Sequence, residues 1–212
     1  MIKLTLVRHG ITILNSTGRW QGHLDEPLSE EGMQQAIKLR RVLRAEDYDQ
    51  IVSSDLKRAY HTATLAVPDA TIMADPRLRE LNFGVMEGRT LEENQQHPSY
   101  LPWKTDPFTH RPEGGESFQD LLDRALDWLS TLQEDTSVLA FSHNGFIRAL
   151  ASHLIGIPRQ AHEPMLLPFP LNTWNTGVTL LQKRQKLWVL EKLNDTGHLL
   201  EPIPLDTALQ HA

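Results

Sequence analysis

Short apolar runs alternate with amphipathic stretches along most of this chain, and this alternation limits its fold more than any other feature. The strand candidates, rich in β-branched and other apolar residues, are 2–7, 50–53, 138–141, 178–181 and 187–190. The stretches with apolar side chains at helical spacing are 29–43, 55–66, 117–132 and 144–154. Because strands separated by helices pair in parallel and are covered on both faces, we expect an α/β fold: a three-layer α/β/α sandwich with a mostly parallel central sheet.

The stretch between residues 95 and 116 breaks this pattern. It contains four prolines and closes with two consecutive glycines, which predicts a loop-rich excursion over the domain. The last two strand candidates, within residues 178–190, predict a hairpin. Because the chain has no internal repeat and no long linker, we expect one domain over residues 1–200 and a loose C-terminal tail over residues 201–212.

The composition narrows the possible partners and chemistries. The net charge of −6 argues against nucleic acid as a partner, so an anionic substrate needs a local positive pocket. The chain has no cysteine, which excludes disulfides, thiolate catalysis and cysteine-based metal sites. The apolar run at residues 1–7 is too short for a signal peptide or a membrane span. We therefore expect a cytoplasmic protein that binds neither membranes nor nucleic acids; the sequence does not predict its oligomeric state.

Two of the strand candidates end in a histidine that is soon followed by glycine. Arg8-His9-Gly10 follows the first strand, and Ser142-His143-Asn144-Gly145 follows the strand at 138–141. The carboxyl ends of parallel strands meet at one edge of a sheet, which is where ligands bind in such folds. We expect both imidazoles at this edge, with the glycines allowing a ligand to approach the backbone.

Two further residues carry charge near the expected edge. Arg58 would lie early in the helix that follows the strand at 50–53, and Glu80 follows Leu78-Arg79. Each has an ordinary explanation when taken alone: a histidine at a strand end is usually structural, Arg58 would be a solvated helix residue, and Glu80 would pair with Arg77 or Arg79. Their joint placement near strand ends favours a shared site.

In combination, these motifs resemble the histidine phosphatase superfamily, which contains the cofactor-dependent phosphoglycerate mutases and many small-molecule phosphatases. The matching segments, in the expected order, are Leu6 to Gly10 with Thr12 and Asn15, Gln21-Gly22, Pro27 to Ser29, Ser53 to Ala59, Glu80 to Gly84, Glu87-Gly88, Gly114 to Ser117 and Ser142 to Gly145. They cover most of the chain. The resemblance implies a phosphoglycerate mutase-like fold.

The resemblance also implies five catalytic residues. His9 would be the nucleophile, because a neutral imidazole has a free lone pair and positive neighbours would lower its pKa. Arg8 and Arg58 would bind the phosphoryl oxygens with guanidinium forks. His143 would donate a further hydrogen bond to these oxygens in the transition state. Glu80 would protonate the leaving alkoxide and then deprotonate water.

Further substrate contacts are implied by the same resemblance, beside those of Arg8, Arg58 and His143. They fall on Asn15, Gln21, Gly22 and Asn144.

The remaining candidates belong to the rim of the pocket. Arg19 and Trp20 could line the entrance, or be an ordinary pair of exposed loop residues. Trp103 and Phe108 could form a lid wall, or simply pack the excursion onto the domain. His61 is expected to be a structural or rim residue.

We expect the chemistry to need no metal and no cofactor, because two arginines and a histidine take the place of the usual divalent cation. The sequence contains no His-Glu-x-x-His motif, no acidic calcium loop and no glycine-rich phosphate loop ending in lysine. No Gly-x-Gly-x-x-Gly follows the first strand, which argues against a dinucleotide enzyme.

The resemblance leaves three functions open. The mutases of the superfamily carry a long insertion between the acid and the second histidine, whereas Glu80 and His143 enclose only a short interval. This favours the compact branch, which includes broad-specificity and α-ribazole phosphatases. We therefore expect a histidine acid-type phosphatase, a phosphoric monoester hydrolase that acts on a small-molecule phosphate monoester and binds inorganic phosphate. The alternatives are phosphoglycerate mutase activity and a catalytically silent member that serves as a binding module.

Substrate choice is poorly encoded. The loops expected around the pocket contain few cations, namely Arg19, Lys104 and Arg111, which disfavours a highly charged substrate. The aromatic residues nearby favour an apolar or aromatic leaving group, such as an aryl or nucleoside-like phosphate.

Overall fold

A computed structural model describes residues 1–158 and 168–200. The strands are β1 (Ile2–Arg8), β2 (Gln50–Ser53), β3 (Met73–Ala74), β4 (Ser137–Ser142), β5 (Val178–Arg184) and β6 (Leu187–Asp195). The α-helices are α1 (Ile13–Ser16), α2 (Glu30–Lys38), α3 (Lys57–Ala66), α4 (Leu91–Gln95), α5 (Tyr100–Thr105), α6 (Phe118–Ser130) and α7 (Asn144–Leu154). Short 3₁₀ turns cover Leu39–Arg41, Ala45–Asp47, Pro76–Leu78, Gly84–Met86 and Gly197–Leu199.

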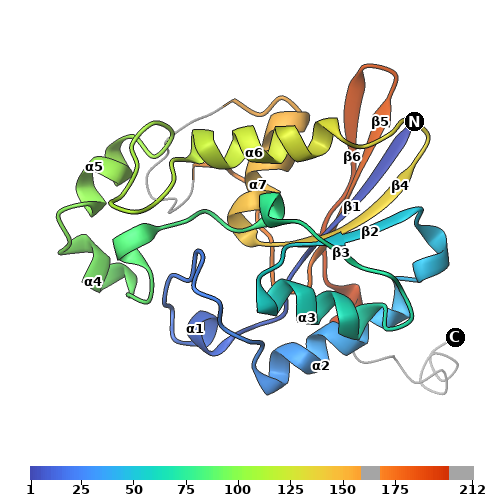
Figure 1. Ribbon diagram of the computed structural model, residues 1–212, viewed down its shortest axis with the longest axis horizontal. Coiled ribbons are helices and arrows are strands. Elements are labelled where there is room, and N and C mark those ends of the chain that lie inside the picture. Colours follow the sequence, from blue (N-terminus) through green and yellow to red (C-terminus); the bar gives the residue numbers. More distant parts are fainter. Residues whose placement is uncertain (159–167, 201–212) are drawn as a thin grey trace, which may run out of the picture.

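The strands form one sheet in the order β3-β2-β4-β1-β5-β6 (Figure 1). β1 pairs in parallel with β4, β4 with β2 and β2 with β3, whereas β5 runs antiparallel to β1 and forms a hairpin with β6. The predicted mostly parallel sheet and C-terminal hairpin are confirmed. The edge strand β3 was not predicted, because its two residues are exposed and show no apolar alternation.

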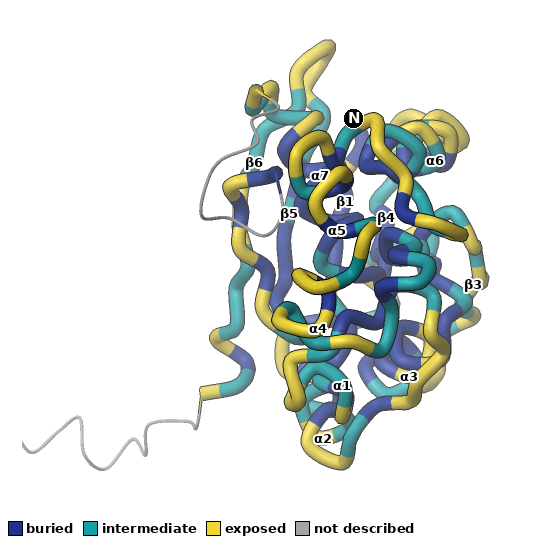
Figure 2. Tube along the Cα trace, turned by 90° about the vertical axis from the view of Figure 1, so that its left-hand side faces the viewer, coloured by how far each residue is buried: buried dark blue, intermediate teal, exposed yellow. Residues whose placement is uncertain are grey.

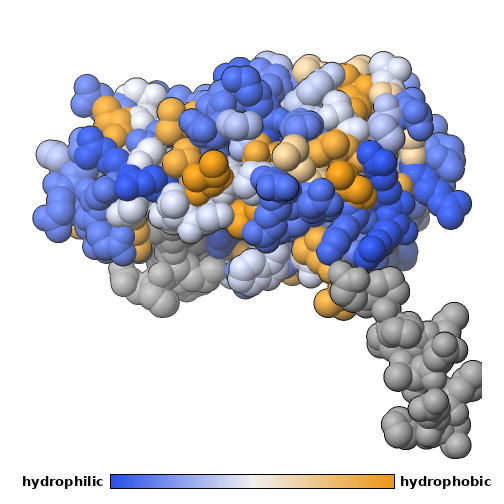
Figure 3. Space-filling view, turned by 90° about the horizontal axis from the view of Figure 1, so that it is seen from below, coloured by the Kyte–Doolittle hydropathy of each residue, from blue (hydrophilic) through white to orange (hydrophobic). Residues whose placement is uncertain are grey.

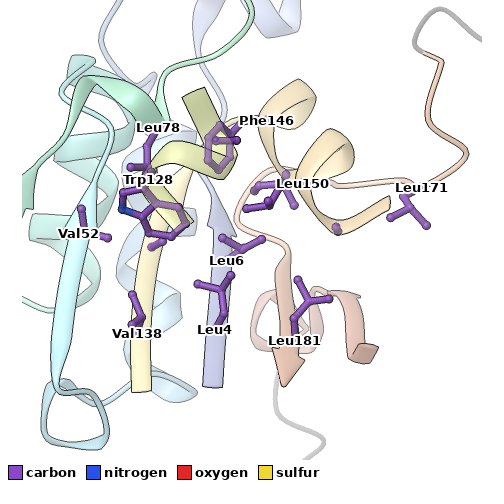
Figure 4. Close-up of a cluster of buried hydrophobic side chains, with 14 residues drawn as sticks. Leu4, Leu6, Val52, Leu78, Trp128, Val138, Phe146, Leu150, Leu171 and Leu181 are labelled. Atoms are coloured by element: carbon purple, nitrogen blue, oxygen red, sulfur yellow. The ribbon is translucent and has the colours of Figure 1, made fainter. Parts of the chain in front are cut away.

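Helices cover both faces of this sheet, with α6 and α7 on one side and α2 and α3 on the other (Figure 1). Alternate residues of β1 serve the two layers: Leu4 and Leu6 pack toward Trp128 of α6 and Phe146 of α7 (Figure 4), whereas Val7 joins the cluster on the α2 and α3 side. The predicted three-layer sandwich is therefore confirmed.

Burial follows this layering. The central strands β1 and β4 are buried along most of their length, whereas the outer turns of α2 and the edge strand β6 are more exposed (Figure 2). The face seen from below is mostly hydrophilic and carries only small, separate apolar patches (Figure 3).

Helix boundaries differ from the prediction where local capping decides them. The Ser29 side chain accepts a hydrogen bond from the Gly32 N–H at 3.1 Å, which starts α2 as predicted. α2 ends at Lys38, and the predicted continuation is a 3₁₀ turn that keeps Leu39 and Leu43 buried. α3 begins at Lys57 rather than at Asp55.

The excursion between residues 95 and 116 is less irregular than predicted. It contains α5, and it packs onto the domain through an aromatic cluster that includes Tyr100, Trp103 and Phe118. The predicted C-terminal tail, residues 201–212, lies outside the described residues.

The parallel strands determine where the candidate site lies. Arg8 is level with Ser142 across β1 and β4, and Ser53 is level with Phe141 across β2 and β4. The residues that follow these three strands therefore lie at one edge of the sheet, as the sequence predicted.

Candidate active site

His9 lies at the carboxyl end of β1 and is only 3% exposed. Its Nδ1 lies 2.7 Å from the carbonyl oxygen of Gly10. A carbonyl only accepts hydrogen bonds, so Nδ1 carries the proton and Nε2 keeps a free lone pair. Burial, and then the charges of Arg58 and Arg8, hold the pKa of His9 well below its ordinary value. The imidazole is thus neutral, with a defined tautomer and a free lone pair on Nε2.

Arg8 and Arg58 bring two buried guanidinium groups to this histidine. Nη1 of Arg8 donates to the Thr173 carbonyl at 2.6 Å, and Arg58 donates through Nη1 and Nη2 to the carbonyls of Leu24 and Gly22, both at 2.7 Å. Burial lowers the pKa of each arginine to about 10, which leaves both charged at neutral pH. The Nε of each is buried and has no partner among the described residues.

His143 follows β4 and is fully buried, with its ring centroid 5.1 Å from that of His9. Its Nε2 lies 2.8 Å from Oγ of Ser54, which also accepts from the Leu56 N–H at 3.3 Å. Burial, followed by the charge of Arg58, keeps the pKa of His143 well below its ordinary value, so the ring is neutral. With the Leu56 N–H on its oxygen, Ser54 is free to donate to Nε2, which leaves the proton on Nδ1. This Nδ1 is buried and unpartnered in the described part of the chain.

The Glu80 carboxyl is fixed by two backbone groups. Oε1 accepts from the Leu81 N–H at 2.8 Å, and Oε2 accepts from the Gly145 N–H at 2.9 Å. A Cβ on Gly145 would lie 2.3 Å from Oε1, so only glycine lets the start of α7 approach the carboxyl this closely.

The neighbouring arginines do not pair with Glu80. Arg77 binds Asp75 at 2.6 Å, and Arg79 binds Asp55 at 2.5 Å. The ordinary explanation for Glu80, an ion pair with one of these two arginines, is therefore wrong.

Gly10 does not serve the purpose that the sequence suggested. A Cβ on Gly10 would lie 2.5 Å from the carbonyl oxygen of Gly32, so this glycine allows the first turn of α2 to approach β1. The expectation that it admits a ligand to the backbone is wrong, because helix packing occupies that space.

These residues surround one pocket with a volume of about 110 Å³. It is lined by Arg8, His9, Asn15, Trp20, Gln21, Gly22, Arg58, Glu80, Phe83, Asn144 and Gly145. The structure thus brings together the residues predicted to bind substrate, with His143 packed beside His9. Three buried donors here lack partners among the described residues: Nε of Arg8, Nε of Arg58 and Nδ1 of His143. Buried donors are normally paired, so this concentration indicates a site for an anion with several oxygens.

A model of the histidine phosphatase superfamily, branch 1, matches residues 4–196 of this sequence. The chain belongs to this superfamily. It is 34% identical over 218 residues to a Yersinia pestis protein named "Probable phosphoglycerate mutase GpmB", covering 95% of this chain and 97% of that protein. The similarity to this relative therefore extends over nearly the whole length of both chains.

Solved structures of superfamily members show the same fold. The α-ribazole phosphatase from Shigella flexneri superposes with a TM-score of 0.79 at 31% identity, covering 92% of this chain and 96% of that one. A phosphoserine phosphatase from Entamoeba histolytica, solved as a histidine-to-alanine mutant with phosphoserine, has a TM-score of 0.79 at 29% identity, covering 94% and 100%.

The rim candidates separate into two groups. Trp20 lines the pocket and packs on Phe83, with ring centroids 4.8 Å apart. Trp103 is fully buried behind this pair, so it belongs to the core and forms no lid wall. Arg19 binds Glu93 at 2.9 Å rather than lining the pocket.

His61 and Phe108 also lie outside the pocket lining. His61 is exposed on α3. Phe108 is half-buried and packs on Phe118, with ring centroids 6.3 Å apart.

Residues 173–176, in the segment just before β5, contact Arg8 and His9. The Thr173 carbonyl accepts from Arg8, the Asn175 side chain donates to the His9 carbonyl at 3.0 Å, and the Thr176 N–H donates to the Arg8 carbonyl at 3.0 Å. Because β5 runs antiparallel to β1, the segment before it arrives at the edge where β1 ends. The sequence analysis gave Ser54 no role of its own, although its place directly after β2 could have indicated one.

Proposed function

We propose that this chain is a metal-independent phosphomonoesterase that forms a phosphohistidine on His9 and uses Glu80 as general acid and base. The observation that carries the proposal is the pocket itself: unpartnered donors of Arg8, Arg58 and His143 beside a neutral, tautomerically fixed imidazole. The phosphatases among its structural relatives support this class of reaction.

In the first half-reaction, Nε2 of His9 attacks phosphorus and the bond to the ester oxygen breaks. Glu80, when protonated, transfers its proton to that oxygen, so that the alcohol leaves neutral. The two arginines and Nδ1 of His143 bind the three other oxygens, whose charge is spread in the transition state. The carbonyl of Gly10 stabilises the positive charge that develops on the His9 ring.

In the second half-reaction, water attacks the phosphohistidine. The Glu80 carboxylate accepts a proton from this water, the P–N bond breaks, and the electron pair returns to Nε2 of His9. Inorganic phosphate and a protonated Glu80 result, and the cycle begins again.

Arg8 and Arg58 supply the positive charge in this scheme and neutral His143 adds a hydrogen bond, so no step requires a metal. Among the described residues, no group of three or more histidine, aspartate or glutamate side chains is arranged to hold a metal ion. The test is para-nitrophenyl phosphate hydrolysis in excess chelator. We expect turnover to persist, and loss of turnover that returns with added metal would contradict metal independence.

The acid limb of the profile of kcat/KM against pH should lie at a lower pH than the titration of a free histidine. The lowered pKa of His9 keeps the nucleophile neutral below its usual value of about 6.5. As pH falls from about 7 to 6, we therefore expect kcat/KM to show no loss that follows an ordinary histidine titration. A plot of log kcat/KM against pH, with a substrate whose own ionisation is known, measures this. A limb centred near 6.5 would show that His9 titrates normally.

Ser54→Ala should lower kcat about tenfold, corresponding to roughly 1.4 kcal/mol, because Nδ1 of His143 would no longer be held as the donor. KM should change less. The ¹⁵N shifts of His143 report the tautomer directly and should change from Nδ1-protonated to a mixture. The Ser53→Ala variant is the control, because its hydroxyl donates to the Ser54 carbonyl instead. An unchanged tautomer in Ser54→Ala would contradict this role.

Phosphoglycerate mutase activity is the second candidate, because curated relatives carry that name. A coupled assay of 3- to 2-phosphoglycerate conversion, compared with phosphate release from the same substrate, separates the two. Isomerisation faster than hydrolysis would replace the phosphatase proposal.

A catalytically silent binding module is the third candidate. A silent binding module would keep its function without a nucleophile, so loss of function in a His9 variant distinguishes the two.

Within the described residues, no helix has the length and apolar character needed to cross a membrane. The cytoplasmic location stays a prediction, which cell fractionation tests.

A further inference from the structure

The segment that carries Trp174 contacts the pocket beside Glu80. Glu80, which faces the leaving oxygen in the proposed reaction, accepts from the Gly145 N–H at 2.9 Å. The next residue back, Asn144, lines the pocket, and its Oδ1 accepts from the Thr173 hydroxyl at 2.7 Å. Trp174 follows Thr173 directly. This hydrogen bond ties the segment that carries Trp174 to the side of the pocket where Glu80 lies.

Trp174 also borders a groove of about 600 Å³ that adjoins the phosphoryl pocket. The groove and the pocket share Arg8 and Asn15. A volume in this range matches sites that hold small organic ligands. The two hollows together therefore have room for a phosphoryl group and a larger substituent.

The Trp174 side chain is 65% exposed, although the backbone that carries it is fixed. Its N–H donates to the Asn194 side chain at 2.6 Å, and its carbonyl accepts from the Gly177 N–H at 2.9 Å. An exposed indole on a fixed backbone offers a large contact area, and only two side-chain torsions have to be ordered on binding.

The chemistry of the groove indicates what would bind there. Apart from Arg8, which serves the phosphoryl group, its described lining is uncharged and includes Gln35, Asn175 and Thr196. Such a surface offers a second anionic group of a substrate no ion pair, whereas an indole and neutral hydrogen-bonding groups suit a planar, uncharged ring.

We propose that Trp174 forms a stacking subsite for a planar, uncharged aromatic leaving group of the phosphate ester. This inference rests on the proposed function for the placement of the phosphoryl group on His9. It assigns the aromatic preference that the sequence suggested to a residue of the segment before β5, which lines the groove, rather than to Trp103 and Phe108, which line neither the pocket nor the groove.

Binding of phosphonates tests the subsite without turnover, because their P–C bond is not cleaved in the proposed reaction. Benzylphosphonate matches phenyl phosphate with a methylene in place of the ester oxygen, and ethylphosphonate is its non-aromatic counterpart. We expect calorimetry to give tighter binding of benzylphosphonate by the native protein. Trp174→Ala should weaken that binding about tenfold and leave ethylphosphonate binding unchanged, since stacking on an aromatic side chain is typically of this size. Trp174→Phe should retain most of the preference.

The control is Leu187→Ala, which removes an equally exposed apolar side chain, 73% exposed, at the start of β6 and should change neither affinity. Equal affinity of the native protein for both phosphonates, or equal weakening of both in Trp174→Ala, would overturn the subsite. So would a Trp174→Ala variant that changes only the sedimentation of the protein, because Trp174 would then contact a second protein. Separate assays of phenyl phosphate hydrolysis show whether the proposed function fails; absent turnover with an intact aromatic preference would overturn the reaction and leave the subsite standing.

Discussion

His9→Ala should lower kcat for phosphomonoesters by a factor on the order of 10⁴ or more, the largest effect expected of any single substitution here. The proposed reaction proceeds through a bond to Nε2 of His9, and no other histidine among the described residues is placed to replace it: His143 lies beside it, but its Nε2 is bound to Ser54. The measurement is steady-state hydrolysis together with incorporation of ³²P from a labelled substrate. The native protein should carry acid-labile label, and the variant none.

A matched substitution separates chemistry from folding. His61→Ala removes an exposed imidazole from α3 and should retain native kinetics. His9→Ala should still bind inorganic phosphate, since the donors of Arg8, Arg58 and His143 remain. A folded His9→Ala protein with near-native turnover would contradict the phosphohistidine mechanism; retained ligand binding with no turnover in either protein would favour the binding-module alternative.

Glu80→Gln should lower kcat by about 10² to 10⁴ for esters of alcohols, because the amide cannot protonate the leaving oxygen. The effect should depend on the leaving group. A nitrophenolate leaves without help, so the first half-reaction with para-nitrophenyl phosphate should stay fast, whereas water attack on the phosphohistidine should be slow. Rapid mixing should then show a burst of nitrophenol of about one equivalent, and labelled phosphoenzyme should accumulate.

Glu113→Gln is the control, because this carboxyl is exposed in the loop before Gly114 and lies outside the pocket lining. It should show native kinetics and no burst. Equal slowing of alkyl and nitrophenyl esters by Glu80→Gln, without a burst, would show that Glu80 orients the pocket rather than transferring protons.

The features that sequence predicted well are those set by local periodicity. The apolar alternation of β1 defines its two faces, and parallel strands bring their carboxyl ends to one edge whatever the loops do. This is why the sequence alone predicts that His9, His143 and Arg58 lie together. The acid-base role of Glu80 needed the family resemblance, because nothing in its own segment indicates that its carboxyl turns toward Gly145.

What sequence did not predict depends on contacts between distant segments. The role of Gly10 follows from how closely α2 approaches β1, and the bond of Ser54 to His143 joins residues 89 positions apart. The burial of Trp103 depends on the packing of α5, and no sequence pattern indicated where this helix begins and ends. Such contacts follow from tertiary packing, which periodicity does not record.

The reversed direction of β5 has a consequence for how such an enzyme changes over time. One strand running the other way brings residues 173–176 to the candidate site from a part of the chain that contributes none of the five candidate catalytic side chains. Thr173 and Asn175 contact Arg8 and His9 through a backbone carbonyl and a side-chain amide, and the Trp174 side chain between them takes no part in these two contacts. Under the proposed function, substitution at this one position would therefore alter which alcohols are released while the phosphoryl chemistry is inherited intact.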